Sequence, residues 1–260
     1  MADPHSPRTP APRIPAWPPK SAPRLFVESE LEAGAELRVE GNQAHYLSRV
    51  MRAGPGSVVI VCDDVTGEWA CEVREAGKRA VILAVLERLR ARENVPDFWL
   101  CPALLKKDRF DLVLEKATEL GAARIQPVIT RRCVADKLNL ERARTITIEA
   151  AEQCARTALP ALAAPTKLKD LLDLWPAQRA LFFADEEGGE PAASAFGAVT
   201  GAAGLLIGPE GGFDASEREA IRAHAAAKPI SLGPRILRGE TAAIAALGVW
   251  MATSGDWDTQ

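Results

Sequence analysis

The sequence predicts an α/β protein, with a small β-barrel over residues 23–92 followed by a mainly parallel α/β domain over residues 93–260. Up to about residue 92, short apolar runs alternate with turns, which is typical of a small barrel. After Pro96, apolar strands alternate with segments of helical spacing, which indicates a parallel sheet covered by helices on both faces. Apolar residues make up 47% of the chain and charged residues 26%, a balance that suits a globular protein.

The segment over residues 1–22 is rich in proline and is predicted to be a disordered tail, because it has little apolar surface to bury. It lacks the apolar stretch of a secretory signal, and no apolar run in the chain reaches the roughly 18 residues that span a bilayer. The cysteines lie far apart without a C-x-x-C pair, which favours free thiols in a reducing cytoplasm. They are Cys62, Cys71, Cys101, Cys133 and Cys154.

In the barrel, order is expected to begin at Arg24–Glu28, and residues 36–40 alternate as a half-buried strand does. A short helix is expected over residues 42–52, followed by a Gly-Pro turn. The further strands are expected over residues 57–62, 68–73 and 79–85.

In the second domain, the apolar residues from Phe110 to Leu120 fall at helical spacing, and Gly121 is expected to end that helix. The predicted strands cover residues 98–101, 124–129, 180–184, 204–207 and 229–232. The further predicted helices cover residues 140–156, 215–227 and 239–251.

Several common catalytic motifs are missing from the sequence. It has no G-x-x-x-x-G-K-[ST] loop, no G-x-G-x-x-G turn and no G-x-S-x-G elbow, and His5, His45 and His224 are too dispersed for a metal cluster. These absences exclude the usual nucleotide hydrolases, dehydrogenases, serine hydrolases and metalloenzymes. The net charge of −3 argues against a protein that coats nucleic acid without specificity, although local basic clusters remain compatible with RNA binding.

Two glycine-containing loops follow predicted strands and precede predicted helices. The first is Leu205–Phe213, with three glycines, and after it Asp214 and Glu217 fit a helix capping box. The second is Ser231–Thr241, which holds arginines and a glutamate around two glycines. Because ligands bind at the carboxyl ends of strands in open α/β sheets, two such loops on neighbouring strands predict one shared site.

The motifs in these loops resemble the bacterial 16S ribosomal RNA (uracil-N3) methyltransferases of the SPOUT superfamily. The resemblance runs from Arg24 to about Trp250. Its parts are Gly208-Pro-Glu-Gly-Gly212, Leu232-Gly-Pro-Arg-Ile-Leu-Arg238 with Glu240-Thr241, His45–Arg52, Lys107–Gly121, Thr130–Cys133 and Glu149–Arg156. The chain departs from the family at Gly239, where the family usually has threonine, and at Ala155, where it commonly has glycine.

The resemblance implies a PUA-like RNA-binding barrel, a trefoil-knotted domain that uses S-adenosylmethionine, a homodimer, and a uridine target in the small ribosomal subunit. It assigns contacts with the cofactor to Ile207, Gly208, Pro209, Glu210, Gly211, Leu232, Gly233, Leu237, Arg238 and Thr241. It assigns RNA contacts to Arg24, His45, Arg49, Arg52, Arg132, Gln153 and Arg156.

A chemical hypothesis follows for two of these side chains. Uracil N3 must lose its proton as it attacks, and negative charge then spreads onto O2 and O4. We expect Arg238 to stabilise that charge, and Glu240 is a candidate base. Two alternatives stay open at this point: a related enzyme that methylates another RNA or the ribose 2′-oxygen, and a non-catalytic RNA-binding or ribosome-assembly factor.

Overall fold

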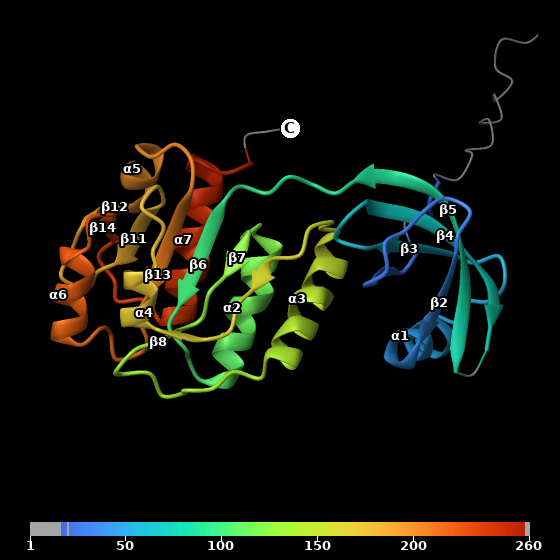
Figure 1. Ribbon diagram of the computed structural model, residues 1–260, viewed down its shortest axis with the longest axis horizontal. Coiled ribbons are helices and arrows are strands. Elements are labelled where there is room, and N and C mark those ends of the chain that lie inside the picture. Colours follow the sequence, from blue (N-terminus) through green and yellow to red (C-terminus); the bar gives the residue numbers. More distant parts are fainter. Residues whose placement is uncertain (1–16, 20, 78, 258–260) are drawn as a thin grey trace, which may run out of the picture. The chain divides into compact units, whose positions relative to one another are not determined.

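The computed structural model describes residues 17–19, 21–77 and 79–257, and the chain divides into two compact units between Arg90 and Ala91 (Figure 1). Most of the predicted disordered tail, residues 1–16 and residue 20, lies outside the described residues. Within the described part of that segment, the Trp17 indole donates a hydrogen bond to Glu87 (2.6 Å). No helix in the described ranges is both long and apolar enough to cross a membrane.

The N-terminal unit is a five-stranded sheet with the strand order β1-β3-β4-β5-β2. Its strands are β1 (Arg24–Phe26), β2 (Glu36–Glu40), β3 (Val58–Cys62), β4 (Gly67–Ala76) and β5 (Ala80–Ala91). A helical segment follows β2 and consists of α1 (Gly41–His45) and the π-helical turn η1 (Tyr46–Val50). The strands β2, β3, β4 and β5 lie where the sequence predicts strands, β4 and β5 continue beyond their predicted ends, and β1 lies in the segment where order was expected to begin.

Alternation of side chains explains why these segments form a sheet around one core. In β2, Leu37 and Val39 are buried, whereas Glu36, Arg38 and Glu40, which alternate with them, are exposed. Leu37 and Val39 join residues from all the other strands of the sheet in a single apolar cluster that also includes Leu47 of η1. The barrel core is therefore formed by one face of the sheet and closed by the helical segment.

The C-terminal unit contains a seven-stranded sheet in which each neighbouring pair is parallel, as the sequence predicts. The strand order is β12-β14-β11-β13-β6-β7-β9. The strands are β6 (Phe98–Pro102), β7 (Arg124–Ile125), β9 (Ala161–Leu162), β11 (Ala180–Ala184), β12 (Glu190–Pro191), β13 (Ala203–Ile207) and β14 (Ala227–Ser231).

The helices of this unit include two that the sequence did not indicate, α4 and α5. They are α2 (Lys107–Glu119), α3 (Leu140–Cys154), α4 (Leu168–Asp173), α5 (Ala192–Gly197), α6 (Ala215–Ala223) and α7 (Gly239–Thr253). The predicted strand over residues 124–129 is divided at Gln126-Pro127, and its second half, β8 (Val128–Ile129), pairs with β10 (Thr166–Lys167) in a separate small sheet.

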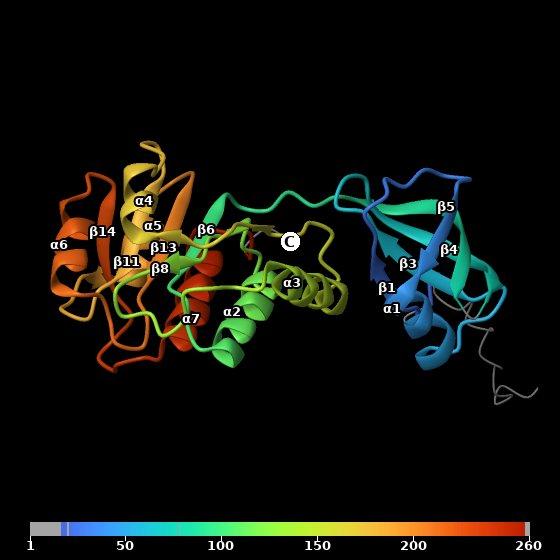
Figure 2. The ribbon, with the colours of Figure 1, turned by 60° about the horizontal axis from the view of Figure 1, so that its bottom comes forward.

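Both faces of the large sheet are buried, which explains the continuous apolar runs of its central strands. Leu205 of β13 faces the core formed with α2, α5 and α7, and its neighbour Leu206 faces the core formed with α4 and α6. Phe182 and Phe183 of β11 divide in the same way. Figure 2 shows α2 and α7 on one side of these strands and α4 on the other. The carboxyl ends of β14, β11 and β13 thereby lie next to one another.

The end of α3 is strained at one of the two positions where the chain departs from the family. Ala155 caps this helix in the left-handed conformation, with φ 60°. Glycine adopts this conformation without a steric penalty, whereas a Cβ makes it unfavourable by about 1 kcal/mol or more. The departure, which the motif alone would rate as minor, therefore has a cost in stability.

We expect Ala155→Gly to stabilise the C-terminal unit by about 1 kcal/mol, because it removes this steric penalty. Thermal unfolding should show a midpoint raised by a few degrees. Ala245→Gly is the matched control, since Ala245 is an exposed residue inside α7 and glycine there should lower the midpoint. A midpoint that falls in both variants would contradict the assignment of strain to Ala155.

A buried carboxylate organises the turn after β3. Asp63 is 3% exposed and accepts hydrogen bonds from the backbone amides of Leu31 (2.8 Å), Val65 (2.9 Å) and Thr66 (2.7 Å). Burial by itself would raise the pKa of Asp63, but these hydrogen bonds and that of the Thr66 hydroxyl favour the ionised form and lower the pKa below its ordinary value. The ionised carboxylate thus contributes to the stability of the barrel.

We expect Asp63→Asn to lower the free energy of unfolding of the barrel by about 1–3 kcal/mol at neutral pH, since it loses a charged acceptor. Because the folded pKa is depressed, the wild-type advantage is present above the unfolded pKa of about 3.9 and is lost as pH falls through the folded pKa. Urea unfolding between pH 7 and pH 2 measures this convergence. Glu75→Gln, which removes an exposed carboxylate of the same unit, should show no such convergence.

Candidate active site

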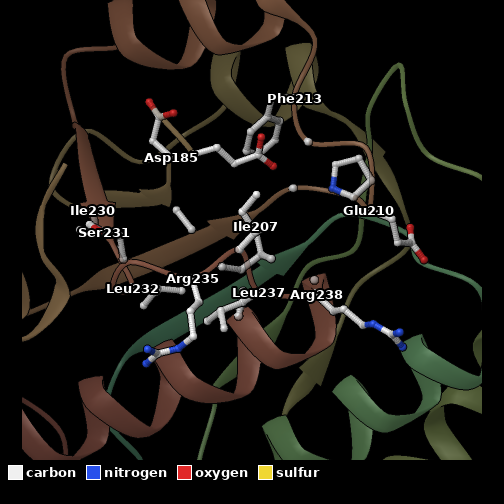
Figure 3. Close-up of a pocket in the computed structure, with 18 of the residues that line it drawn as sticks. Asp185, Ile207, Glu210, Phe213, Ile230, Ser231, Leu232, Arg235, Leu237 and Arg238 are labelled. Atoms are coloured by element: carbon white, nitrogen blue, oxygen red, sulfur yellow. The ribbon is translucent and has the colours of Figure 1, made fainter. Parts of the chain in front are cut away.

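A cavity of about 480 Å³ opens at the carboxyl ends of β11, β13 and β14. Three segments line it: residues 184–188 after β11, residues 207–213 after β13 and residues 230–239 after β14. Figure 3 shows Asp185, Ile207 and Leu232 around it, one from each segment. The position agrees with the general rule that parallel sheets bind ligands beyond the carboxyl ends of their strands.

The loop after β13 is held tightly by its glycines. A Cβ on Gly208 would lie 3.2 Å from the ring of Phe213, and Gly212 has a φ of +66° that favours glycine. Asp214 and Glu217 form the predicted capping box, so α6 begins directly after the loop. Arg132 donates a hydrogen bond to the carbonyl of Gly211 (2.7 Å) and anchors the outer side of the loop.

The loop after β14 places two arginines at the mouth of the cavity. Arg235 and Arg238 are both exposed, and Figure 3 shows their guanidinium groups at opposite ends of the loop. Between them, Ile236 is 93% exposed. The helix α7 begins at Gly239, which is buried.

Eight of the ten residues predicted to bind a cofactor line the cavity. They are Ile207, Gly208, Pro209, Glu210, Leu232, Gly233, Leu237 and Arg238. Gly211 and Thr241 do not line it. Gly211 faces the side chain of Arg132, and Thr241 is an exposed residue in the first turn of α7.

The two residues predicted to be catalytic lie in different surroundings. Glu240 is 8% exposed and does not line the cavity, because the first turn of α7 directs it toward α2, where its Oε1 lies 3.7 Å from Nε of Arg109. Arg109 also pairs with Glu210 (3.3 Å). Arg238, by contrast, makes no ion pair with any carboxylate in the described part of the chain, so its guanidinium is available to a ligand.

The predicted RNA-binding residues of the barrel divide into two groups. His45, Arg49 and Arg52 are exposed and follow one another along the α1–η1 segment. Arg24 is paired with the buried Glu68 (2.8 Å), which also binds Arg90. The side chains of the first group form no ion pair within the described residues, whereas Arg24 takes part in the internal ion-pair network of the barrel.

In the C-terminal unit, the structure places Arg156 in the interior. Arg156 is 5% exposed, and its two terminal nitrogens donate to the carbonyls of Thr118 and Ala122 (2.7 Å each). It ties the loop after α3 to the end of α2. Gln153 and Arg132 are exposed.

Sequence reasoning missed the segment after β11. Ala184, Asp185, Glu186 and Gly188 all line the cavity. Asp185 is fully buried and pairs with Arg218 (3.2 Å) and Arg222 (2.6 Å). The available signal was the same as for the other two loops, a polar glycine-containing segment directly after an apolar strand. Arg109 of α2 also lines the cavity, and nothing in the sequence around it indicated that α2 reaches this site.

Comparison with known proteins agrees with this architecture. Residues 92–251 match the RNA methyltransferase domain family, and residues 39–86 match the RNA methyltransferase PUA domain. The chain is 31% identical to ribosomal RNA small subunit methyltransferase E of Mycobacterium bovis, over 90% of this chain and 93% of that protein. It is 30% identical to the protein of the same name from Bacillus subtilis, over 86% of this chain and 94% of that protein.

A solved structure shares the fold over almost the whole chain. It is the ribosomal RNA small subunit methyltransferase E of Neisseria gonorrhoeae bound to S-adenosylmethionine, with a TM-score of 0.82, 26% identity, and coverage of 91% of this chain and 99% of that one. The chain therefore belongs to the RNA methyltransferase domain family, with a PUA-like barrel before a SPOUT domain. The family resemblance and the fold class predicted from the sequence are confirmed, while the trefoil knot stays a prediction.

Gly239, the other departure from the family, lies at a close approach between segments. A Cβ there would be 3.0 Å from Cδ2 of Leu105 and 3.3 Å from the carbonyl oxygen of Gly208. Leu105 is 3% exposed and fills the space beside Gly239. The large side chain before α2 and the missing side chain at α7 are thus complementary.

We expect Gly239→Thr to weaken cofactor binding and to lower the unfolding midpoint, because the new side chain forces Leu105 or the Gly208 carbonyl to move. The double variant Leu105→Ala/Gly239→Thr should recover most of the cofactor affinity. Calorimetric titration of both single variants and the double variant measures their coupling. Additive effects of the two substitutions would contradict this account.

Proposed function

We propose that the protein transfers the methyl group of S-adenosylmethionine to N3 of a uridine in 16S ribosomal RNA. The observation that supports this most directly is the cavity at the strand ends, which Arg238 lines without an ion pair to any of the described carboxylates. Relatives that share the whole architecture are named ribosomal RNA methyltransferases, and the one from Neisseria gonorrhoeae was solved with this cofactor. The uracil atom itself is inferred from the motif resemblance.

The cavity suits an adenosine-type cofactor. Its volume of about 480 Å³ lies within the usual range for small-ligand sites, roughly 300–1,000 Å³. Ile207, Leu232 and Leu237 provide apolar contacts, and Gly208 and Gly233 leave backbone groups open to the ligand. The cofactor supplies a methyl group already activated by its sulfonium, so the task of the protein is to orient the acceptor.

The acceptor nitrogen requires charge stabilisation, and we assign this to Arg238. Loss of the N3 proton places negative charge on the two uracil oxygens, and a guanidinium without a protein partner can donate to them. Glu240 was the candidate base, but its side chain does not line the cavity and lies beside Arg109, which does. We propose instead that the Arg109–Glu240 pair positions the N-terminus of α7, from which Arg238 projects.

RNA contacts are proposed on each unit separately. On the barrel, the exposed basic side chains are His45, Arg49 and Arg52. On the C-terminal unit, Arg132, Gln153 and Arg235 are exposed. Phosphate contacts of this kind position an RNA without reading its sequence. The chain is further proposed to act in the cytoplasm as a homodimer on 16S RNA or the 30S subunit, and sedimentation of the purified protein tests the dimer.

We expect Arg238→Ala to lower kcat by about 10²–10³-fold, the effect typical of removing one group that stabilises transition-state charge. Affinity for S-adenosylmethionine should change by less than about threefold, because most of the cavity is untouched. Transfer of labelled methyl to 30S subunits or 16S RNA, with nucleoside mass spectrometry, measures turnover and identifies the methylated atom. Arg235→Ala is the matched control on the same loop, and it should raise the KM for RNA with kcat kept.

The same experiment separates the alternatives. Near-normal turnover of Arg238→Ala would overturn its catalytic role. Label on a ribose oxygen or on another RNA would identify a related methyltransferase with a different target. Failure of the wild-type chain to bind the cofactor would favour the non-catalytic RNA-binding factor.

A further inference from the structure

The segment after β11 lines the cavity together with the two glycine-containing loops, and it contains a carboxylate that neither loop motif includes. Glu186, directly after β11, lines the cavity and lies against Gly212 of the opposite loop. A Cβ on Gly212 would stand only 2.7 Å from Oε1 of Glu186. The absence of a side chain at Gly212 therefore allows the Glu186 carboxylate to reach the cavity rim.

The charge on Glu186 is less neutralised than that of its acidic neighbours. Asp185 is enclosed by Arg218 and Arg222, and Glu210 is paired with Arg109. The nearest cation to Glu186 is Arg218, at 3.9 Å, and Arg218 is already shared with Asp185 and Glu187. The Glu186 side chain is 58% exposed, so its carboxylate faces the opening with its negative charge largely uncompensated.

We propose that Glu186 recognises the positive charge of S-adenosylmethionine and makes the site prefer this cofactor over the demethylated product, S-adenosylhomocysteine. The inference rests on the proposed function and deepens it. In methyl transfer, the bond between sulfur and the methyl carbon breaks and its electron pair stays on sulfur, while the methyl carbon bonds to N3, whose proton leaves to solvent. The sulfonium thereby becomes a neutral thioether, and the ligand loses one positive charge.

A carboxylate in this position distinguishes the two ligands by that one charge. In a cavity of about 480 Å³, a ligand charge lies within about one Debye length, roughly 8–10 Å, of the walls. Because the Glu186 side chain is 58% exposed, water screens part of this attraction, and the expected preference is modest. S-adenosylmethionine is therefore bound more tightly than S-adenosylhomocysteine, which favours replacement of the product by new cofactor after each turnover.

The test is calorimetric titration of the full chain with three ligands: S-adenosylmethionine, S-adenosylhomocysteine, and sinefungin, in which a protonated amine replaces the sulfonium. Glu186→Gln should weaken S-adenosylmethionine and sinefungin about tenfold, or about 1.4 kcal/mol, and S-adenosylhomocysteine by less than about threefold. Glu186→Asp keeps the charge and should retain most of the preference. Glu190→Gln is the control, because Glu190 is an exposed carboxylate four residues further on that does not line the cavity.

Equal weakening of all three ligands by Glu186→Gln, or no weakening of any, would overturn the inference. Unfolding midpoints of the variants exclude loss of structure as the cause of weaker binding. If the wild-type chain binds S-adenosylmethionine and Glu186→Gln binds it equally well, this inference alone fails. If the wild-type chain does not bind the cofactor, the proposed function fails and the inference fails with it.

Discussion

Burial of both faces of the parallel sheet is the constraint on which the site depends. Neighbouring residues such as Leu205 and Leu206 pack into separate cores, so a one-residue shift of β13 would move each side chain into the other core and disrupt the packing of both. The same holds for β11 next to it. With these strands held in place, their carboxyl ends form a rigid edge, and the loops that follow can adopt strained, glycine-dependent paths around the cavity.

The fold was predictable wherever the apolar pattern was long or strongly periodic. The strands β2, β6, β11 and β13 and the helices α2, α3 and α7 begin and end close to the predicted residues. The short helices α4 and α5 were not predicted, because six residues give too little periodicity and their burial depends on tertiary packing. The division of one predicted strand at Gln126-Pro127 likewise depends on a pairing with β10, far along the chain.

The site was predictable in part for a related reason. Loop motifs identify residues that share a local sequence, and most of those in the two glycine-containing loops do line the cavity. Contacts between distant segments could not be predicted from local motifs. Examples are the contact of Arg109 in α2 with Glu240 and that of Glu186 with Gly212. The interior position of Arg156 could not be predicted from its motif either, because a basic residue in an RNA-enzyme motif can also donate to backbone carbonyls.

The contact between Leu105 and Gly239 also bears on how this sequence diverged. Leu105, which precedes the Lys107–Gly121 motif, and Gly239 share one volume, so we expect a change at either to require a matching change at the other. A search of genomes that weighs each position alone would score Gly239 as decay of the motif. A search that weighs the two positions jointly would score Gly239 as a compensating change in side-chain size, and would retain such chains among the functional members.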